Sequence, residues 1–367
     1  MCGISGYIGN KDAYPIIING LKRLEYRGYD SAGVLMYDGD EINLSKTKGK
    51  VSALEEITNK DPKRKEGNIG IGHTRWATHG VPNDVNSHPH LSQSGDLAIV
   101  HNGIIENYDT LRKELISRGY VFQSDTDTEV LVNLIEEVKK QEKCKLGKAV
   151  QIALTQVSGA YAIAVFDKKK PNEIIVARLG SPIAIGVGKN NEEFFIASDA
   201  SPFIEFTKDA IYLEDEEMAI IKPGRDIRVR KIMDDSYVDA VIQKLQISLE
   251  QIEKGGYDHF MIKEIHEQPK AITDTYRGRM LADQGIIRMA GVDDNLQRFL
   301  DAERIIIVAC GTSWHAGLVG EYLFEDMARI PVEVEYASEF RYRNPIITPK
   351  DIVIAISQSG ETADTLA

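Results

Sequence analysis

A long series of short β-favouring segments over the first 230 or so residues most constrains the fold. Segments such as GISGYIG, SAGVLMY, DLAIVHNG and AYAIAVFD are bounded mostly by Gly, Asn, Asp or Pro. Helical periodicity interrupts them at 12–26, 107–118 and 128–139. Strands in runs, with helices grouped elsewhere, favour layered sheets covered by helices.

The pattern changes near residue 240. A polar stretch with the pair Gly255-Gly256 predicts a linker leading into a helix kinked at Pro269. The apolar segments RIIIVAC, VEVEYA and DIVIAIS then alternate with helical or irregular stretches, which predicts a parallel, doubly wound sheet. We therefore expect two domains, 1–240 and 241–367, and the second to be incomplete because such a sheet rarely ends after three strands.

Charge and composition disfavour several classes of protein. The 56 acidic residues exceed the 44 basic ones, and the net charge of −12 argues against binding to nucleic acid or to an anionic membrane. The chain has no apolar run near the roughly 18 residues of a membrane span, and its start lacks the features of a signal peptide. Three cysteines without CxxC spacing favour a reducing compartment, so we expect a cytoplasmic protein.

The cysteine at position 2 is the most informative single residue. Removal of Met1 would leave Cys2 with a free α-amino group, whose pKa of about 7.7–8.0 keeps part of it neutral and able to accept a proton. Nucleophile and base would then lie on one residue. From its position alone, Cys2 could equally be a small buried residue at the start of a strand.

Five motifs follow one another in the first part of the chain: CGISGYIG, RLEYRGYDSAG, GHTRWATHG, HNGIIENY and SDTDTEV. Together they resemble the glutamine amidotransferases that use an N-terminal cysteine. With ACGTS at 309–313, ASEFRYR at 337–343 and SQSGETADT at 357–365, the chain is most similar to the glutamine–fructose-6-phosphate aminotransferase (isomerising) family. This resemblance implies an α+β N-terminal-nucleophile αββα sandwich, followed by the opening part of an α/β parallel-sheet sugar isomerase (SIS) domain.

The resemblance also implies a reaction and the residues that perform it. Glutamine's amide nitrogen would pass through an internal channel to fructose 6-phosphate, giving glucosamine 6-phosphate and glutamate. Cys2 would attack the amide, and the Asn102 side chain with the Gly103 N–H would stabilise the oxyanion. The other matching positions are Arg75, Thr78 and His79 for the glutamine carboxylate, Asp127 for its ammonium group, and Trp76 as the gate for ammonia.

Each of these residues also has an ordinary structural interpretation. Asn102-Gly103 could be a turn, Arg75 a surface salt bridge, and Asp127 a helix N-cap. The sequence does not decide whether Arg27 tunes the thiolate or only holds its loop.

Two turns in the second domain favour a phosphate. CGTS and SQSGET each follow a strand and open a helix, at the sheet edge where ligands bind. Helix caps are the structural alternative for either turn. The positions that match the family are Thr312, near the sugar, and the phosphate-binding residues Ser313, Ser357, Gln358, Ser359 and Thr362.

The family residues that open the sugar ring would follow Ala367, so we expect this chain to hydrolyse glutamine without making glucosamine 6-phosphate. The resemblance implies no metal, nucleotide or flavin cofactor, and a homodimer for the full-length enzyme.

Three alternatives remain open at this point. The first is a glutaminase with another acceptor, as in asparagine synthetase or phosphoribosylpyrophosphate amidotransferase, and the second is a non-catalytic module that binds a sugar phosphate. The third is a zinc hydrolase, suggested by five closely spaced histidines but supported by no HExxH motif. These histidines are His73, His79, His88, His90 and His101.

Overall fold

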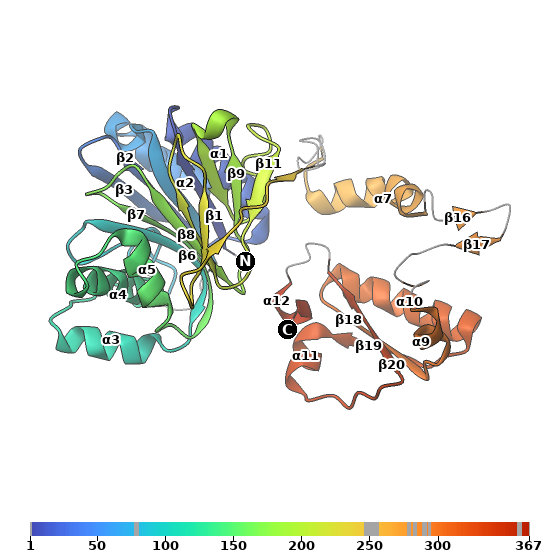
Figure 1. The fold of residues 1–367 in the computed structure, drawn as a ribbon. Coiled ribbons are helices and arrows are strands. Elements are labelled where there is room, and N and C mark those ends of the chain that lie inside the picture. The colour runs from blue at the N-terminus through green and yellow to red at the C-terminus, as the bar shows by residue number, and fades with distance from the viewer. Residues whose placement is uncertain are drawn as a thin grey trace. The chain divides into compact units, whose positions relative to one another are not determined.

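The computed structural model describes residues 2–76, 81–245, 257–276, 280–281, 285–287, 292, 295–357 and 362–366. The chain divides into two compact units, Met1–Glu253 and Lys254–Ala367, and each is described by itself (Figure 1).

Two antiparallel sheets form the centre of the first unit. The first sheet has the order β15-β11-β9-β10-β1-β4-β2-β3, and the second has the order β14-β13-β12-β8-β7-β6-β5. The strands of the first sheet are β1 (Gly3–Ile8), β2 (Ser31–Tyr37), β3 (Ile42–Lys48), β4 (Ile69–Arg75), β9 (Ala184–Val187), β10 (Phe194–Ala197), β11 (Asp209–Tyr212) and β15 (Gln243–Lys244). Those of the second are β5 (His90–Leu91), β6 (Leu97–Ile105), β7 (Gly159–Asp167), β8 (Ile174–Leu179), β12 (Glu217–Ile221), β13 (Arg228–Lys231) and β14 (Tyr237–Val238).

Alternation of side chains along the strands creates the layers. On β6, Ala98 and Val100 belong to the apolar cluster between the two sheets, whereas Ile99 belongs to the cluster under the helices. The first sheet is covered by α1 (Ala13–Leu24) and α2 (Val51–Asn59), and the second by α3 (Tyr108–Ser117), α4 (Asp127–Gln141) and α5 (Leu146–Leu154). The predicted αββα sandwich is thus confirmed (Figure 1).

Short helices were harder to predict than long ones. The predicted helices at 12–26, 107–118 and 128–139 correspond to α1, α3 and α4, but α2 and α5 were missed. Both missed helices have nine residues and pack against a sheet, which stabilises helices too short to be stable alone. Three 3₁₀ turns complete this unit: η1 (Glu25–Arg27), η2 (Pro62–Lys65) and η3 (Lys189–Asn191).

The second unit contains the predicted parallel sheet. Strand β18 (Arg304–Ala309) lies between β19 (Val332–Tyr336) and β20 (Asp351–Ile356), and it pairs in parallel with both. The other elements are α7 (Phe260–Tyr276), which contains Pro269, β16 (Met280–Leu281), β17 (Ile286–Ile287), α9 (Leu296–Leu300), α10 (Thr312–Ala328), α11 (Ala337–Tyr342) and α12 (Ala363–Leu366). Among the helices described in either unit, none has the length and apolar character needed to cross a bilayer.

The apolar layer between the sheets should dominate the stability of the first unit. Phe166 on β7 is fully buried there, and its ring centroid lies 5.4 Å from that of Tyr37 on β2. We expect Phe166→Ala to lower the free energy of unfolding by about 3–5 kcal/mol, measured by urea denaturation. Val121→Ala, at a side chain that is 73% exposed, should change it by less than about 0.5 kcal/mol. Equal effects of the two changes would contradict this account of the core.

Candidate active site

Cys2 directly precedes β1, beside the end of β4. Its Sγ accepts a hydrogen bond from the Trp76 N–H at 3.2 Å. Burial raises the pKa of the Cys2 thiol, although the Trp76 N–H and the nearby Arg75 charge act in the opposite direction. The thiol is therefore protonated at neutral pH, and its use as a nucleophile requires a proton acceptor.

The Asn102 amide is held in one orientation beside Cys2. Its Nδ2 donates to the Cys2 carbonyl oxygen at 3.3 Å and to Ser198 Oγ at 2.9 Å. Its Oδ1 lies 2.8 Å from His73 Nε2, and because an amide oxygen can only accept, His73 must carry its proton on Nε2. His88 Nδ1 lies 3.1 Å from His73 Nδ1 and 3.2 Å from His73 Nε2, so the two imidazoles are in direct contact. This chain of bonds turns the amide nitrogen of Asn102 toward Cys2.

Gly103, the next residue of β6, occupies a position that requires glycine. Its φ is +128°, and a Cβ built on it would lie 2.1 Å from the Ala160 carbonyl oxygen on β7. The backbone at this point can therefore lie close to β7 only without a side chain.

A small pocket brings five of the predicted glutamine-site residues together. It has Cys2 and the buried residues Arg75 and Asp127 in one lining. A cation and an anion in one pocket match the two charged groups of an amino acid. The full lining is Cys2, Arg75, Trp76, His88, His101, Gly103, Thr126, Asp127 and Thr128.

Asp127 is the first residue of α4 and does not cap it. The N-cap is Thr126, whose Oγ1 accepts from the Glu129 N–H at 3.3 Å. Asp127 Oδ2 instead accepts the Ile105 N–H at 2.8 Å. The interpretation of Asp127 as an N-cap is therefore wrong, and its buried carboxylate faces the pocket.

The remaining predicted residues of this region have different positions. Trp76 is 54% exposed, and its ring packs so closely on Gly28 that a Cβ there would lie 2.8 Å from it. Arg27 donates a hydrogen bond to Asp199 Oδ2 at 2.9 Å, and Asp199 directly follows Ser198. Thr78 and His79 lie outside the described residues.

Four of the five clustered histidines are buried hydrogen-bonding groups. Besides the His73–His88 contact, His90 Nε2 lies 3.1 Å from Thr126 Oγ1, and His101 Nδ1 lies 2.9 Å from Thr128 Oγ1. Burial lowers the pKa of all four imidazoles, that of His73 to about 3, so they are neutral at pH 7. Within the described part of the chain, no group of three or more His, Cys, Asp or Glu side chains is arranged to hold a metal ion.

The predicted phosphate turns of the second unit lie at one edge of its sheet. Thr312 and Ser313 begin α10 just after β18, and Ser357 directly follows β20. Because β18 and β20 are adjacent and parallel, Thr312 and Ser313 lie at the same edge of the sheet as Ser357. Ser357 Oγ is 3.1 Å from Thr362 Oγ1. Gln358 and Ser359 lie outside the described residues.

Sequence reasoning missed three residues that position the first site. Ser198 and His73 bind the Asn102 amide, and Thr126 begins the helix that carries Asp127. Thr126 stands three residues before Glu129, and this capping pattern could have revealed it. Ser198 and His73 carry no local signal, because their partners lie 96 and 29 residues away.

The neutral histidines should make the stability of the first unit depend on pH. His73 and His88 stay neutral when folded but gain protons below about pH 6.5 when unfolded. Stability should therefore fall as the pH drops from 7 toward 4, by up to about 1.4 kcal/mol per pH unit for each histidine. Urea denaturation at several pH values measures this slope.

A matched pair of variants separates this effect from general acid sensitivity. His88→Gln should make the dependence of unfolding free energy on pH shallower. His259→Gln, at an exposed residue directly before α7, should leave that dependence unchanged. An unaltered slope in His88→Gln would show that this imidazole is not the source.

Comparison with known proteins identifies both domains. A glutamine amidotransferase domain matches residues 59–222, and a SIS domain matches residues 298–367. Among solved structures, the glutamine phosphoribosylpyrophosphate amidotransferase from B. subtilis, complexed with ADP and GMP, aligns with a TM-score of 0.55 and 24% identity. That alignment covers 98% of this chain and 69% of the other, and it supports the fold.

Two relatives with higher identity share one description. The glutamine--fructose-6-phosphate aminotransferase (isomerizing) of Bacteroides thetaiotaomicron is 57% identical over 371 residues, and that of Chlorobaculum tepidum is 55% identical over 369. Each match covers 100% of this chain and 59% of the relative, so the chain spans about three fifths of the length of these curated relatives. Since the match runs through both domains in order, the chain is similar along its whole length to the isomerizing glutamine--fructose-6-phosphate aminotransferases and carries a glutamine amidotransferase domain and a SIS domain.

Proposed function

We propose that residues 1–240 form a glutaminase domain in which Cys2 attacks the side-chain amide of L-glutamine. The observation that carries this proposal is the fixed Asn102 amide: His73 holds its oxygen, and its nitrogen donates to Ser198 Oγ and, at a longer 3.3 Å, to the Cys2 carbonyl oxygen. In the proposal, the hydrogen of the longer bond turns to the oxyanion as its charge develops. A preorganised neutral donor beside a nucleophile is what a developing oxyanion requires. The Gly103 N–H is the second donor of the proposal.

The reaction needs a base because the thiol is protonated at rest. Once Met1 is removed, the α-amino group of Cys2 takes the thiol proton as the C–S bond forms. The oxyanion then collapses, the C–N bond breaks, and the amine returns the proton to the leaving ammonia. Water hydrolyses the thioester, which releases glutamate and restores the thiol.

Recognition of glutamine uses its charged end. Arg75 pairs with the α-carboxylate, with Thr78 and His79 completing that site, and Asp127 binds the α-ammonium group. Trp76 gates the exit of ammonia. Their support is the pocket that joins Arg75, Asp127 and Trp76 to Cys2.

For the whole protein, we propose fructose 6-phosphate as the acceptor and glucosamine 6-phosphate as the product. Residues 241–367 then contribute a linker and part of the SIS domain. The sugar-phosphate residues of the proposal are Thr312, Ser313, Ser357, Gln358, Ser359 and Thr362. The parallel sheet supports this assignment, because it brings both turns to one edge. We also propose that the full-length enzyme is a homodimer.

Substitution of the nucleophile tests the glutaminase proposal. Cys2→Ala should abolish glutamate and ammonia release from glutamine, whereas Cys144→Ala, at a thiol packed beside α5, should leave it unchanged. Acetylation of the Cys2 amine in protein that lacks Met1 should also abolish release, because the base is lost. Full activity of Cys2→Ala would refute the assignment.

The Asn102 bonds predict a graded set of defects. Asn102→Ala should lower kcat for glutamine hydrolysis by about 10²–10³-fold, the usual cost of one oxyanion donor. His73→Phe should lower kcat less, because the donor remains but loses its fixed orientation, and KM should change by no more than about twofold. Asn59→Ala, at an exposed Asn that ends α2, serves as the control. A defect in KM alone would contradict an oxyanion role.

A further inference from the structure

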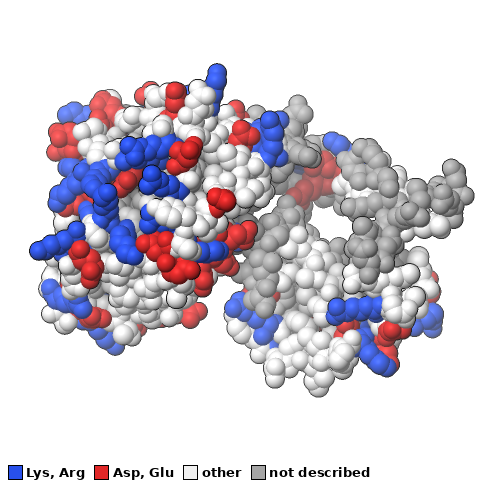
Figure 2. Space-filling view, viewed as in Figure 1, with Lys and Arg blue, Asp and Glu red and all other residues white. Residues whose placement is uncertain are grey.

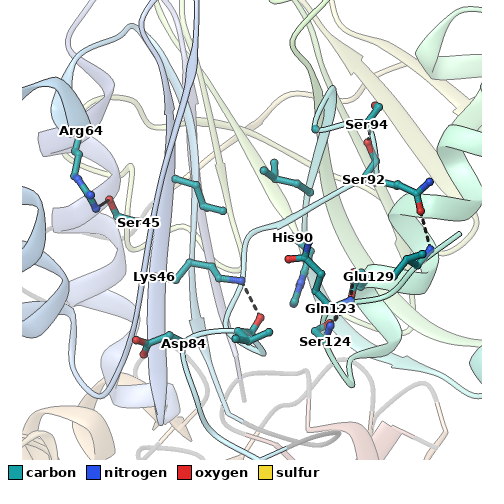
Figure 3. Close-up of a pocket in the computed structure, with 16 residues that line it drawn as sticks. Ser45, Lys46, Arg64, Asp84, His90, Ser92, Ser94, Gln123, Ser124 and Glu129 are labelled. Atoms are coloured by element: carbon teal, nitrogen blue, oxygen red, sulfur yellow. Dashed lines mark hydrogen bonds between the residues drawn. The ribbon is translucent and has the colours of Figure 1, made fainter.

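A second cavity lies in the first unit, apart from the Cys2 pocket. It has a volume of about 720 Å³, within the usual range for small-molecule sites. Figure 3 shows residues of β3 and η2 on one side of it, and residues in and after β5 and in and before α4 on the other. The two pockets share no lining residue. This cavity is therefore a separate space and not an extension of the glutamine site.

Both carboxylates at this cavity have hydrogen-bond donors of their own. Glu129 accepts from the Gln123 N–H at 2.9 Å, and from the N–H and hydroxyl of Ser124, each at 2.6 Å. Asp84 Oδ1 accepts the Lys48 N–H at 2.8 Å. The negative charges are thus already stabilised by the protein.

The two cations differ in their partners. Arg64 lies 3.5 Å from the Asp61 carboxylate and donates to Ser45 Oγ at 3.3 Å. Lys46 Nζ reaches into the cavity from β3 and donates to the Val85 carbonyl oxygen at 2.9 Å (Figure 3). Within the described ranges, the ion pairs found for the lining residues do not include Lys46.

The environment of Lys46 favours an added negative charge. Burial lowers its pKa to about 8, even though Glu129 and Asp84 act in the opposite direction. The ammonium group is still mostly protonated at pH 7, and it is desolvated without a directly paired carboxylate. Lys and Arg side chains also gather over β2 and β3 in Figure 2, which favours the approach of anions.

We propose that this cavity binds a small organic anion whose phosphate or carboxylate group contacts Lys46. The Leu44, Val85 and Leu91 side chains line the cavity and offer an apolar wall for the carbon part of the ligand. Ser45 Oγ, which accepts from Arg64, supplies a hydroxyl hydrogen for the anion. The positive charge of Lys46 selects an anion, and the other residues that line the cavity limit the size of the ligand.

A contact between His90 and Thr126 links this cavity to the pocket that contains Cys2. His90 lines the second cavity, and its Nε2 is 3.1 Å from Thr126 Oγ1, the cap of the helix that begins with Asp127. The binding proposal does not depend on this link or on glutamine hydrolysis.

Calorimetric titration of the full chain with inorganic phosphate, and separately with malonate, tests the proposal. We expect saturable binding of at least one probe, and at least about tenfold weaker binding in Lys46→Gln. Lys63→Gln makes the same charge change at an exposed residue next to Arg64 and should bind like the unmodified chain. Lys46→Arg keeps the positive charge and should retain part of the affinity. Its binding shows that a change at position 46 does not by itself prevent folding.

The outcomes are distinct. Only binding that is lost in Lys46→Gln is assigned to this cavity; among that, stronger binding of phosphate assigns a phosphate-bearing ligand, and stronger binding of malonate assigns a carboxylate. Binding that Lys46→Gln leaves unchanged overturns the proposal, because it then arises at another site. Absence of binding for both probes up to about 50 mM, far weaker than ordinary ligand sites, overturns the proposal. Equal losses in Lys46→Gln and Lys63→Gln also overturn it, because they indicate a general charge effect. None of these readouts uses glutamine, so they are independent of the glutaminase assays.

Discussion

The orientation of the Asn102 amide is the constraint on which the glutamine site depends. An amide can flip, and a flipped Asn102 would present an acceptor to Cys2 in place of a donor. Two distant residues prevent this, since Ser198 accepts from Nδ2 and His73 donates to Oδ1. His73 is itself oriented by His88, so the chemistry at β6 depends on a buried chain of hydrogen bonds.

The two stacked sheets bring these groups together. Cys2 and His73 belong to the first sheet's β1–β4 region, whereas Asn102 and Gly103 belong to β6 of the second. The site therefore lies where the two layers meet, and α4 adds Asp127 from the helical layer. Packing between the sheets, through residues such as Phe166, keeps the strands that carry Cys2 and Asn102 together.

Local patterns in the sequence were sufficient for the layers but not for the positioning contacts. The strands β2 and β7 match the predicted segments SAGVLMY and AYAIAVFD, because alternation and turn residues are local signals. The motifs around Cys2, Arg75 and Asp127 named residues that the fold does bring into one pocket. Ser198 could not be found in this way, since its role exists only once β10 lies beside β1. The alternative interpretation of Asp127 as the N-cap was one residue late: Asp ranks above Thr as a cap, yet Thr126 makes the bond.

The electrostatics of the pocket bear on the choice of base. An imidazole is the usual proton acceptor for a cysteine nucleophile, and four histidines surround this site. Burial makes them poor bases, however, and a group with a pKa of about 3, as in His73, accepts few protons from a thiol whose own pKa is raised. An α-amino group with a pKa of about 8 is much better matched to that thiol. The neutral imidazoles add no positive charge. Among the described residues that line the pocket, Arg75 is then the cation that can pair with a carboxylate. Burial thus makes His73 a poor base, and the neutral imidazole that results can hold the Asn102 amide in one orientation.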